Sequence, residues 1–226
     1  MKNKRISIII PAYNEGSRIK KTLKPLVDHP LIDELIVVDD GSSDDTGKMA
    51  WECGALVSRL EKNKGKGWAL RHGIKQAKGD IIGFLDGDVE ESSIEIQKLI
   101  TPIIDGDCDV TIAQFPPAKK KGGFGFVKKL AQWGIYFYTK QTIYSSLSGQ
   151  RIFTREVLED ITMPVGGYGV EVDMTIDILN KGYRICEIPV NMNHAETGRD
   201  FQGFKHRARQ FFHIFIVLIK RLVKRR

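Results

Sequence analysis

Short apolar runs rich in β-branched residues alternate with longer polar segments over the first half of the chain. The runs lie at 6–10, 34–40, 55–60, 81–86 and 110–115. The segments between them carry apolar residues at helical spacing, with turn residues at their ends, and cover 15–27, 45–53, 68–77 and 92–104. This alternation is typical of strands joined by crossover helices. It predicts an α/β fold with a mostly parallel central sheet flanked by helices.

The second half of the chain predicts fewer elements. A stretch rich in proline, lysine and glycine, 116–125, indicates a loop. Helical patterns follow at 126–147 and 170–180, a strand pattern at 183–190, and a final helix pattern from about Phe204. We therefore expect a catalytic domain over residues 1–200 and an amphipathic C-terminal helix within 201–226.

Polar clusters follow three of the predicted strands. They read PAYNE after the first strand, DDGSSDD after the second and DGD after the fourth. In open α/β sheets, ligands bind at the carboxyl ends of the strands. We therefore expect these clusters to meet in one site.

The DGD cluster contains two carboxylates, Asp86 and Asp88, on either side of Gly87. Glycine leaves room for the two side chains to converge on one point. Hard oxygen ligands of this kind suit Mg²⁺ or Mn²⁺, above all where the ion keeps waters and binds substrate phosphates. A solvated acidic turn is the alternative, and only the surrounding motifs favour the metal site.

Four segments of the chain together resemble family 2 glycosyltransferases, which have the A-type glycosyltransferase fold. They are SIIIPAYNEGSRI (7–19), ELIVVDDGSSDDT (34–46), NKGKGWALRHGIKQAKGDIIGFLDGDV (63–89) and LSGQRIFTREVL (147–158). The likeness is strongest to the branch of dolichyl- and polyprenyl-phosphate sugar transferases. It implies a single Rossmann-like domain that uses a nucleotide sugar, a UDP-sugar being favoured over GDP-mannose, and inversion at the anomeric carbon.

The resemblance also implies roles for individual residues of the donor site. A divalent cation, Mg²⁺ or Mn²⁺, would be bound by Asp86 and Asp88 and would hold the diphosphate of the donor. The remaining matches belong to the nucleotide pocket, in which Lys66 would reach a base edge or a phosphate. The predicted nucleotide-binding residues are Pro11, Tyr13, Glu15, Asp40, Gly65, Lys66, Asp86 and Gly87.

Two carboxylates, Glu171 and Asp173, lie at the predicted start of the helix over 170–180. The resemblance makes Glu171 the first candidate, and Asp173 the second, for the base that deprotonates an acceptor hydroxyl, although the chain lacks the usual Glu-Asp doublet. Acidic residues at a helix start also favour the helix dipole, so a capping role is the alternative. A lipid phosphate acceptor is already anionic and would need no base.

Gln150 and Arg151 match the segment of the family that faces the sugar and the acceptor phosphate, and Arg151 is the strongest candidate for a catalytic anion contact. His194 follows a predicted strand end, where it could be a third metal ligand; a structural histidine is the alternative. Further phosphate-binding residue types follow it in the sequence: Arg199, His206 and Arg207.

Positive charge is concentrated in two parts of the chain, which has a net charge of +7. Eight basic residues and no acid follow Asp200, and a second stretch without acids spans 110–155. An anionic partner is therefore expected. The three cysteines have no metal-like spacing, and the apolar run at 6–10 is too short for a signal-peptide core. Both features indicate a cytoplasmic protein.

The predicted C-terminal helix contains the sequence FFHIFIVLIKRLVKRR. Its apolar stretch, 211–219, is too short to span a bilayer. Basic residues flank it, so the helix could lie in the interface of an anionic leaflet, and docking on the domain is an equal alternative. The lysine-rich, aromatic-rich segment 119–140 favours the membrane. We expect a peripheral protein at the inner face of the cytoplasmic membrane that glycosylates a polyprenyl phosphate, a glycolipid or another membrane-linked acceptor.

Three other interpretations stay open at this point. The acceptor could be a small soluble molecule such as a phosphorylated glycerate, or the enzyme could be a retaining A-type transferase. The basic segments could bind nucleic acid, although their charge is interleaved with long aliphatic runs and no nucleic-acid motif is present. The chain could also be an inactive scaffold of the same fold, against which the presence of both Asp86 and Asp88 argues.

Overall fold

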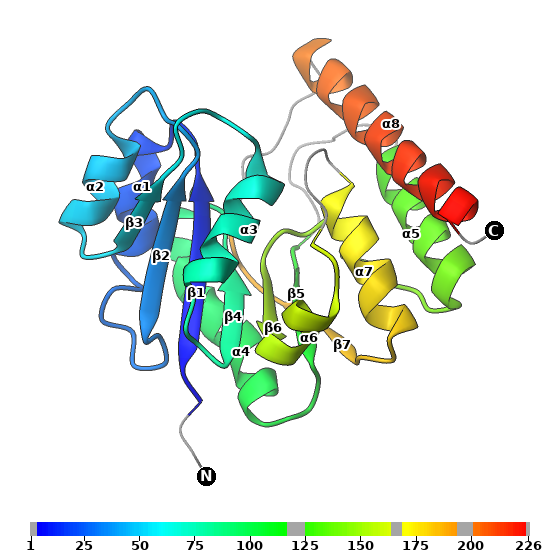
Figure 1. Cartoon of the computed structure of the whole chain (residues 1–226), viewed down its shortest axis with the longest axis horizontal. Coiled ribbons are helices and arrows are strands. Elements are labelled where there is room, and N and C mark those ends of the chain that lie inside the picture. Colours follow the sequence, from blue (N-terminus) through cyan, green and yellow to red (C-terminus); the bar gives the residue numbers. More distant parts are fainter. Residues whose placement is uncertain (1–3, 117–124, 164–168, 194–200, 225–226) are drawn as a thin grey trace.

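A central sheet with helices on both faces forms the body of the protein (Figure 1). The computed structural model describes residues 4–116, 125–163, 169–193 and 201–224, without the side chains of 201–206 and 224. The strand order across the sheet is β3-β2-β1-β4-β6-β5-β7. The strands are β1 (Ile6–Ala12), β2 (Glu34–Asp39), β3 (Leu56–Arg59), β4 (Ile81–Phe84), β5 (Val110–Gln114), β6 (Arg151–Thr154) and β7 (Ile185–Pro189). The predicted α/β class is confirmed.

Two helical layers cover the sheet because successive side chains of a strand point to opposite faces. Ile8 of β1 packs in the layer of α1, α2 and α4, whereas Ile9 packs in the layer of α3, α5 and α7. The helices are α1 (Gly16–Leu23), α2 (Thr46–Glu52), α3 (Lys66–Gln76), α4 (Ile96–Ile104), α5 (Phe126–Thr139), α6 (Arg155–Asp160), α7 (Val170–Asn180) and α8 (Phe201–Lys224), and a 3₁₀ helix, η1 (Glu90–Glu95), precedes α4.

One strand, β6, was not expected from the hydrophobic pattern. It has four residues and runs antiparallel to both of its neighbours, β4 and β5, in a sheet whose other pairs are parallel. β6 lies between two buried strands, β4 and β5. Pairing with these neighbours, more than its own short sequence, makes it a strand. The mostly parallel sheet is therefore confirmed, with β6 as an addition.

The helix predicted over 126–147 is shorter than expected and ends at Thr139. Lys140 has a left-handed backbone conformation, with φ of 60°, which terminates α5. Beyond it, the Glu187 carboxylate of β7 accepts hydrogen bonds from the backbone N–H groups of Tyr144, at 3.0 Å, and Ser145. The segment after α5 is thus held by a strand distant in sequence, and it forms a wall of the site described below.

The C-terminal helix α8 lies along α5 and α7 (Figure 1). Ile214 and Leu218 of α8 are buried in the core on this side of the sheet. A Cβ atom at Gly134 of α5 would lie only 2.6 Å from Leu218 Cδ1, so the glycine permits this close approach. Docking of the helix on the domain, one of the two alternatives that the sequence left open, is therefore observed. In the described part of the chain, every helix is too short or too polar to cross a membrane.

Candidate active site

Three strand ends meet at one edge of the sheet, as the polar clusters predicted. The backbone N–H of Asp40, after β2, donates to the Ala12 carbonyl at the end of β1, at 2.8 Å. The N–H of Leu85, after β4, donates to the Ile9 carbonyl at 3.1 Å. The loops that carry PAYNE, DDGSSDD and DGD are therefore neighbours in space.

Asp40 fixes the glycine-rich loop that precedes α3. Its buried carboxylate accepts hydrogen bonds from the backbone N–H groups of Lys64, at 2.8 Å, and Gly65, at 2.7 Å. Gly65 has a φ of 90°, which favours glycine, and α3 begins at the next residue, Lys66. A carboxylate has about four lone-pair sites, so Asp40 can still accept a hydrogen bond from a nucleoside. Its first role, however, is to direct Lys66 into the site.

The PAYNE loop is held by the loop after β2. Asp44 accepts the backbone N–H of Gly16 at 3.0 Å, and the Thr46 hydroxyl accepts that of Glu15 at 2.8 Å. Pro11 lies near the end of β1, and Tyr13 is 46% exposed in the loop that follows, so its ring is free to face a ligand.

Glu15 is connected to the DGD turn through Arg18, a residue that the sequence did not single out. An Arg18 guanidinium nitrogen lies 2.7 Å from Glu15 Oε2, and the other lies 3.8 Å from Asp88 Oδ2. Burial raises the pKa of Glu15 above its ordinary value; Asp88 adds to this shift, while Arg18 opposes it. Arg18 thus balances two carboxylates that would otherwise repel each other.

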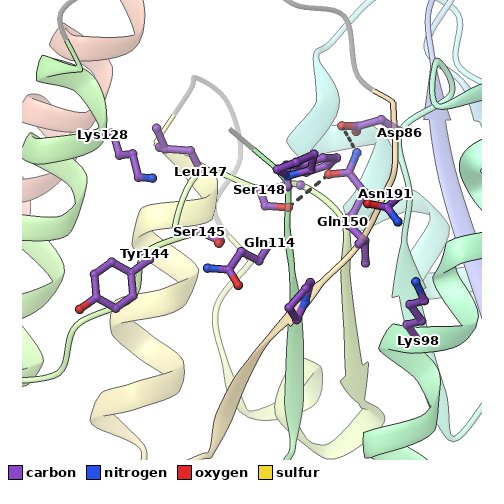
Figure 2. A pocket seen from close by; sticks show the side chains of 15 residues that line it. Asp86, Lys98, Gln114, Lys128, Tyr144, Ser145, Leu147, Ser148, Gln150 and Asn191 are labelled. Carbon is purple, nitrogen blue, oxygen red and sulfur yellow. Dashed lines mark hydrogen bonds between the residues drawn. The ribbon is translucent and has the colours of Figure 1, made fainter. Parts of the chain in front are cut away.

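Lys66 and Asp86 form the central contact of the site. Lys66 Nζ lies 2.5 Å from Asp86 Oδ1 and 3.8 Å from Glu171 Oε1, at the first turn of α7. Burial alone would lower the pKa of Lys66, but the carboxylates of Asp86 and Glu171 raise it above its ordinary value. The other oxygen of Asp86 accepts a hydrogen bond from Gln150 Nε2 at 2.8 Å (Figure 2). Lys66 and Gln150 therefore contact Asp86 from two separate segments, and Glu171 joins them through Lys66.

The metal expected at Asp86 and Asp88 fits these donors. The ammonium group against Asp86 and the guanidinium near Asp88 indicate that this turn attracts positive charge. Within the described residues, no group of three or more His, Cys, Asp and Glu side chains forms a complete metal site. Two carboxylates that leave the other positions to water and phosphate oxygens are typical of Mg²⁺ and Mn²⁺ sites.

Gly87 does not have the role that the sequence suggested. Its φ lies outside the left-handed region, and a Cβ atom there would be at an ordinary distance of 3.5 Å from Glu15 Cγ. The turn between Asp86 and Asp88 therefore does not require glycine. The Gly87 carbonyl instead accepts a hydrogen bond from the buried Thr22 hydroxyl at 2.9 Å, which fixes the turn on α1.

A cavity of about 950 Å³ adjoins Asp86 on the side away from the nucleotide loops (Figure 2). Gln114 at the end of β5, Asn191 after β7 and Ser148 before β6 contribute polar groups, and Lys128 of α5 faces the cavity. Apolar side chains form another part of its wall. They are Phe115, Pro116, Leu147, Pro189 and Val190. Such a mixture suits a ligand with both a polar and an apolar part.

Arg151 does not face this cavity, contrary to the predicted phosphate contact. Its side chain is 1% exposed, and its guanidinium donates to the Ser148 carbonyl at 2.8 Å, the Ser146 carbonyl at 2.8 Å and the Thr175 hydroxyl at 2.9 Å. Burial lowers the pKa of Arg151 to about 10, opposed by Glu171, so it is charged at neutral pH. Arg151 thus fixes the cavity wall against α7.

Of the two candidate bases, only Glu171 faces the site. Asp173 instead binds Arg221 of α8 through both its carboxylate and its backbone carbonyl, and Arg221 also lies 2.7 Å from Asp177. A residue two positions along a helix points to a different side, so Glu171 and Asp173 cannot share one role. Asp173 is a docking residue for the C-terminal helix.

Several predicted residues cannot be assigned to this site. His194 and Arg199 lie outside the described residues, as does the side chain of His206. Arg207 belongs to α8 and is not among the residues that line the cavity. Many of the lining residues carry no signal in the sequence, because they come from unrelated segments without a shared motif: Lys98, Gln114, Phe115, Lys128, Tyr144, Ser145 and Asn191.

The strand order, the carboxylates at the strand ends and the adjoining cavity agree with the A-type glycosyltransferase fold. Residues 7–162 match the protein family described as "Glycosyl transferase family 2". The chain belongs to this family, as its motifs predicted.

Two relatives and one group of solved structures are similar to most of the chain. The chain is 27% identical to "Glycosyltransferase AglJ" of Haloferax volcanii, over 86% of this chain and 65% of the relative. It is 31% identical to "Glucosyl-3-phosphoglycerate synthase" of Mycolicibacterium smegmatis, over 78% of this chain and 64% of the relative. The chain therefore spans just under two thirds of the length of each.

The solved structures are those of glucosyl-3-phosphoglycerate synthase from Mycobacterium tuberculosis. Its complex with Mn²⁺, UDP and glucosyl-3-phosphoglycerate superposes with a TM-score of 0.78 and 27% identity, over 95% of this chain and 80% of that chain. A complex of the same protein with Mg²⁺ and UDP has a TM-score of 0.79. The expected cofactor, Mg²⁺ or Mn²⁺, agrees with these two cations.

Proposed function

We propose that this enzyme transfers a sugar from a UDP-sugar to a phosphate-bearing acceptor linked to a membrane lipid, such as a polyprenyl phosphate. The observation that carries the proposal is the position of Asp86. One of its oxygens contacts Lys66 of the nucleotide loop, and the other contacts Gln150, which lines the cavity. A donor diphosphate bound at Asp86 would therefore present its sugar toward an acceptor in the cavity.

Asp86 and Asp88 would hold the divalent cation, with the donor diphosphate completing its shell. The ion, when bound, neutralises charge that develops on the leaving UDP. UDP is the favoured nucleotide because the structures of the mycobacterial relative contain UDP with Mn²⁺ or Mg²⁺.

The side chains around Asp86 have distinct parts in this function. Asp40 holds the loop that carries Lys66, and the Lys66 ammonium group can turn from Asp86 to a donor phosphate when that phosphate arrives. Gln150 orients the Asp86 carboxylate. Glu171 is available as a base if the acceptor is a hydroxyl group, whereas a phosphate acceptor is already an anion.

The mixed lining of the cavity supports a lipid-linked acceptor. Lys128 offers a cation for a phosphate, and Phe115, Leu147 and Val190 offer apolar contacts for the first part of a hydrocarbon chain. A small phosphorylated acceptor of the phosphoglycerate type is the second candidate. It is favoured by the similarity of the chain to glucosyl-3-phosphoglycerate synthases.

The test has two stages, donor binding and acceptor use. UDP-sugars and GDP-mannose are screened with Mn²⁺ for thermal stabilisation of the protein, and the best donor is then assayed with a polyprenyl phosphate in detergent and with 3-phosphoglycerate. We expect stabilisation by a UDP-sugar and transfer to the polyprenyl phosphate. Transfer to 3-phosphoglycerate alone would replace the lipid proposal by the second candidate, and no stabilisation by any donor would contradict both.

Two additions make this assay specific to the proposed site. Asp88→Asn should abolish the effect of Mn²⁺, whereas Asp105→Asn, a change at an exposed carboxylate after α4, should leave it unchanged. The coupling constant of the anomeric proton in the product tests the inversion that the family resemblance implies.

A further inference from the structure

The C-terminal helix buries one side against the domain and leaves an adjacent apolar side uncovered. Leu218 packs against Gly134 of α5, and Val217 approaches Gly169 at the start of α7. A helix that served only to cover the domain would carry polar residues elsewhere. Six large apolar residues of α8 are instead between 42% and 70% exposed: Phe212, Phe215, Ile216, Ile219, Leu222 and Val223.

A second apolar stripe follows the exposed side of α5. Phe126, Trp133 and Phe137 are between 40% and 63% exposed, and their spacing of seven and four residues aligns them along one side of the helix. The rings of Trp133 and Phe137 are stacked, with centroids 5.5 Å apart. Lys140 lies 5.7 Å from the ring centroids of Tyr136 and Phe137, so a cation borders the aromatic stripe.

The two stripes belong to one surface, which we call the α5–α8 face. The Tyr138 hydroxyl donates to the Leu218 carbonyl at 2.6 Å, so α5 and α8 are in direct contact. Phe215 and Leu222 lie three and four residues from Leu218, which turns them toward α5 rather than α7. The exposed residues of α8 therefore continue the aromatic stripe of α5. Figure 1 shows the two helices side by side at the edge of the molecule.

Along the two helices of this face, the charge is of one sign. Neither α5 nor α8 contains an acidic residue, and the basic side chains of Lys128, Lys129, Lys140, Arg209 and Lys220 are exposed. The acids nearest in α7, Asp173 and Asp177, are bound to Arg221. Pairing with a second copy of the chain would bring like charges together, whereas a surface that is apolar inside and anionic outside would complement the face.

We propose that the α5–α8 face binds the surface of an anionic lipid bilayer, with its aromatic and aliphatic side chains inserted at headgroup level. Aromatic rings are enriched at this depth, and basic residues beside them attract anionic lipids. Lys128 belongs both to this basic rim and to the cavity wall, so the cavity would open close to the lipid surface. The inference rests on the proposed function only for its acceptor, because the face would bind lipid with or without a sugar donor.

The test uses the three tryptophans of the chain, of which Trp133 lies in the α5–α8 face and Trp51 is a matched control. Trp51 is 71% exposed on α2, which covers the other face of the sheet. The variants Trp51→Phe/Trp68→Phe and Trp68→Phe/Trp133→Phe each keep one reporter. With vesicles of phosphatidylcholine and phosphatidylglycerol that contain brominated lipid, we expect quenching of the Trp133 fluorescence and none for Trp51.

Flotation with the same vesicles measures the strength of binding. Phe215→Ser combined with Trp133→Ser should weaken binding at least tenfold, Trp51→Ser should leave it unchanged, and Lys129→Gln or Lys220→Gln should each weaken it about fivefold at low salt. Mn²⁺-dependent stabilisation by the donor, measured without vesicles, should be the same in all variants. This readout separates a failed lipid site from a failed donor site. Equal quenching of both reporters, no flotation, or a dimer that only the Phe215 and Trp133 changes dissociate would overturn the proposal.

Discussion

The proposed donor side of the site, around Asp40 and Lys66, and the proposed acceptor side, around the cavity, are constructed differently. On the donor side, carboxylates bind the backbone of neighbouring loops, as Asp40 does with Lys64 and Gly65. On the acceptor side, charged side chains connect distant elements, as Arg151 does between the cavity wall and α7. A polar motif residue on the donor side therefore shapes the binding surface directly, whereas one on the acceptor side supports the elements behind it.

This difference indicates which motif residues are placed to contact a ligand. Lys66 and Asp86 are partly exposed, with side chains 38% and 31% accessible, and they meet at the junction of the two sides. Arg151 belongs to a motif of the same family and is fully enclosed. We therefore expect changes on the donor side to affect ligand binding and catalysis, and changes at the charged motif residues of the acceptor side to affect stability.

The largest effect is expected at the junction, for Asp86→Asn. The amide cannot supply the negative charge that a divalent cation needs, so the turnover number should fall about 10³-fold, or about 4 kcal/mol in activation free energy. The urea midpoint should change little, because Asp86 is partly exposed. Steady-state assays over a range of Mn²⁺ concentrations measure the effect. A variant that retains turnover would remove Asp86 from the metal site.

The second prediction contrasts two adjacent residues, Arg151 and Gln150. Arg151→Met should lower the free energy of unfolding by about 3 kcal/mol, because it leaves the buried oxygens of Ser146, Ser148 and Thr175 without their donor. Gln150→Met should lower activity through Asp86 and change stability by less than about 1 kcal/mol. Urea denaturation and kinetics are measured for both. The comparison fails if Arg151→Met raises the acceptor KM in a protein of unchanged stability.

The parts of the fold that the sequence predicted are those that local patterns specify. The strand ends with Asp40 and Asp86 could be located because a buried run, a turn and an acid follow one another along the chain. For Arg151 the sequence predicted a phosphate contact instead of its structural role, because packing brings its three partners to it. The same holds for β6, which is defined by its neighbours β4 and β5.

A third prediction concerns the link between Arg221 and the first turns of α7. Arg221→Met should lower the free energy of unfolding by about 2 kcal/mol, because it removes the cation that binds the half-buried carboxylates of Asp173 and Asp177. Lys220→Met, on the exposed side of α8, is the matched control and should have no such effect. Proteolysis of the C-terminal segment should be faster only in the Arg221 variant. Donor affinity should not change, and a loss of it would mean that Asp173 acts in the site after all.

The smallest effect is expected for Lys66→Met, a change in the affinity for Mn²⁺. It is also the most specific test of the junction. Without nucleotide, the ammonium group of Lys66 competes with a metal ion for Asp86, at 2.5 Å from its Oδ1. Removing this charge should raise the affinity for Mn²⁺ alone about tenfold, equal to about 1.4 kcal/mol.

The same variant should bind UDP more weakly in the presence of Mn²⁺, because Lys66 is then free to contact a phosphate in the wild-type protein. Opposite signs of the two changes distinguish this exchange from a general loss of structure, which would weaken both. Lys64→Met is the matched control, since its ammonium group lies over the Trp68 ring at 5.7 Å and not at Asp86. Titration of Mn²⁺ by electron paramagnetic resonance measures the first affinity and calorimetry the second. An unchanged affinity for Mn²⁺ in the absence of nucleotide would show that Lys66 does not compete with the metal ion for Asp86. Arg18 would then be the cation that neutralises this turn.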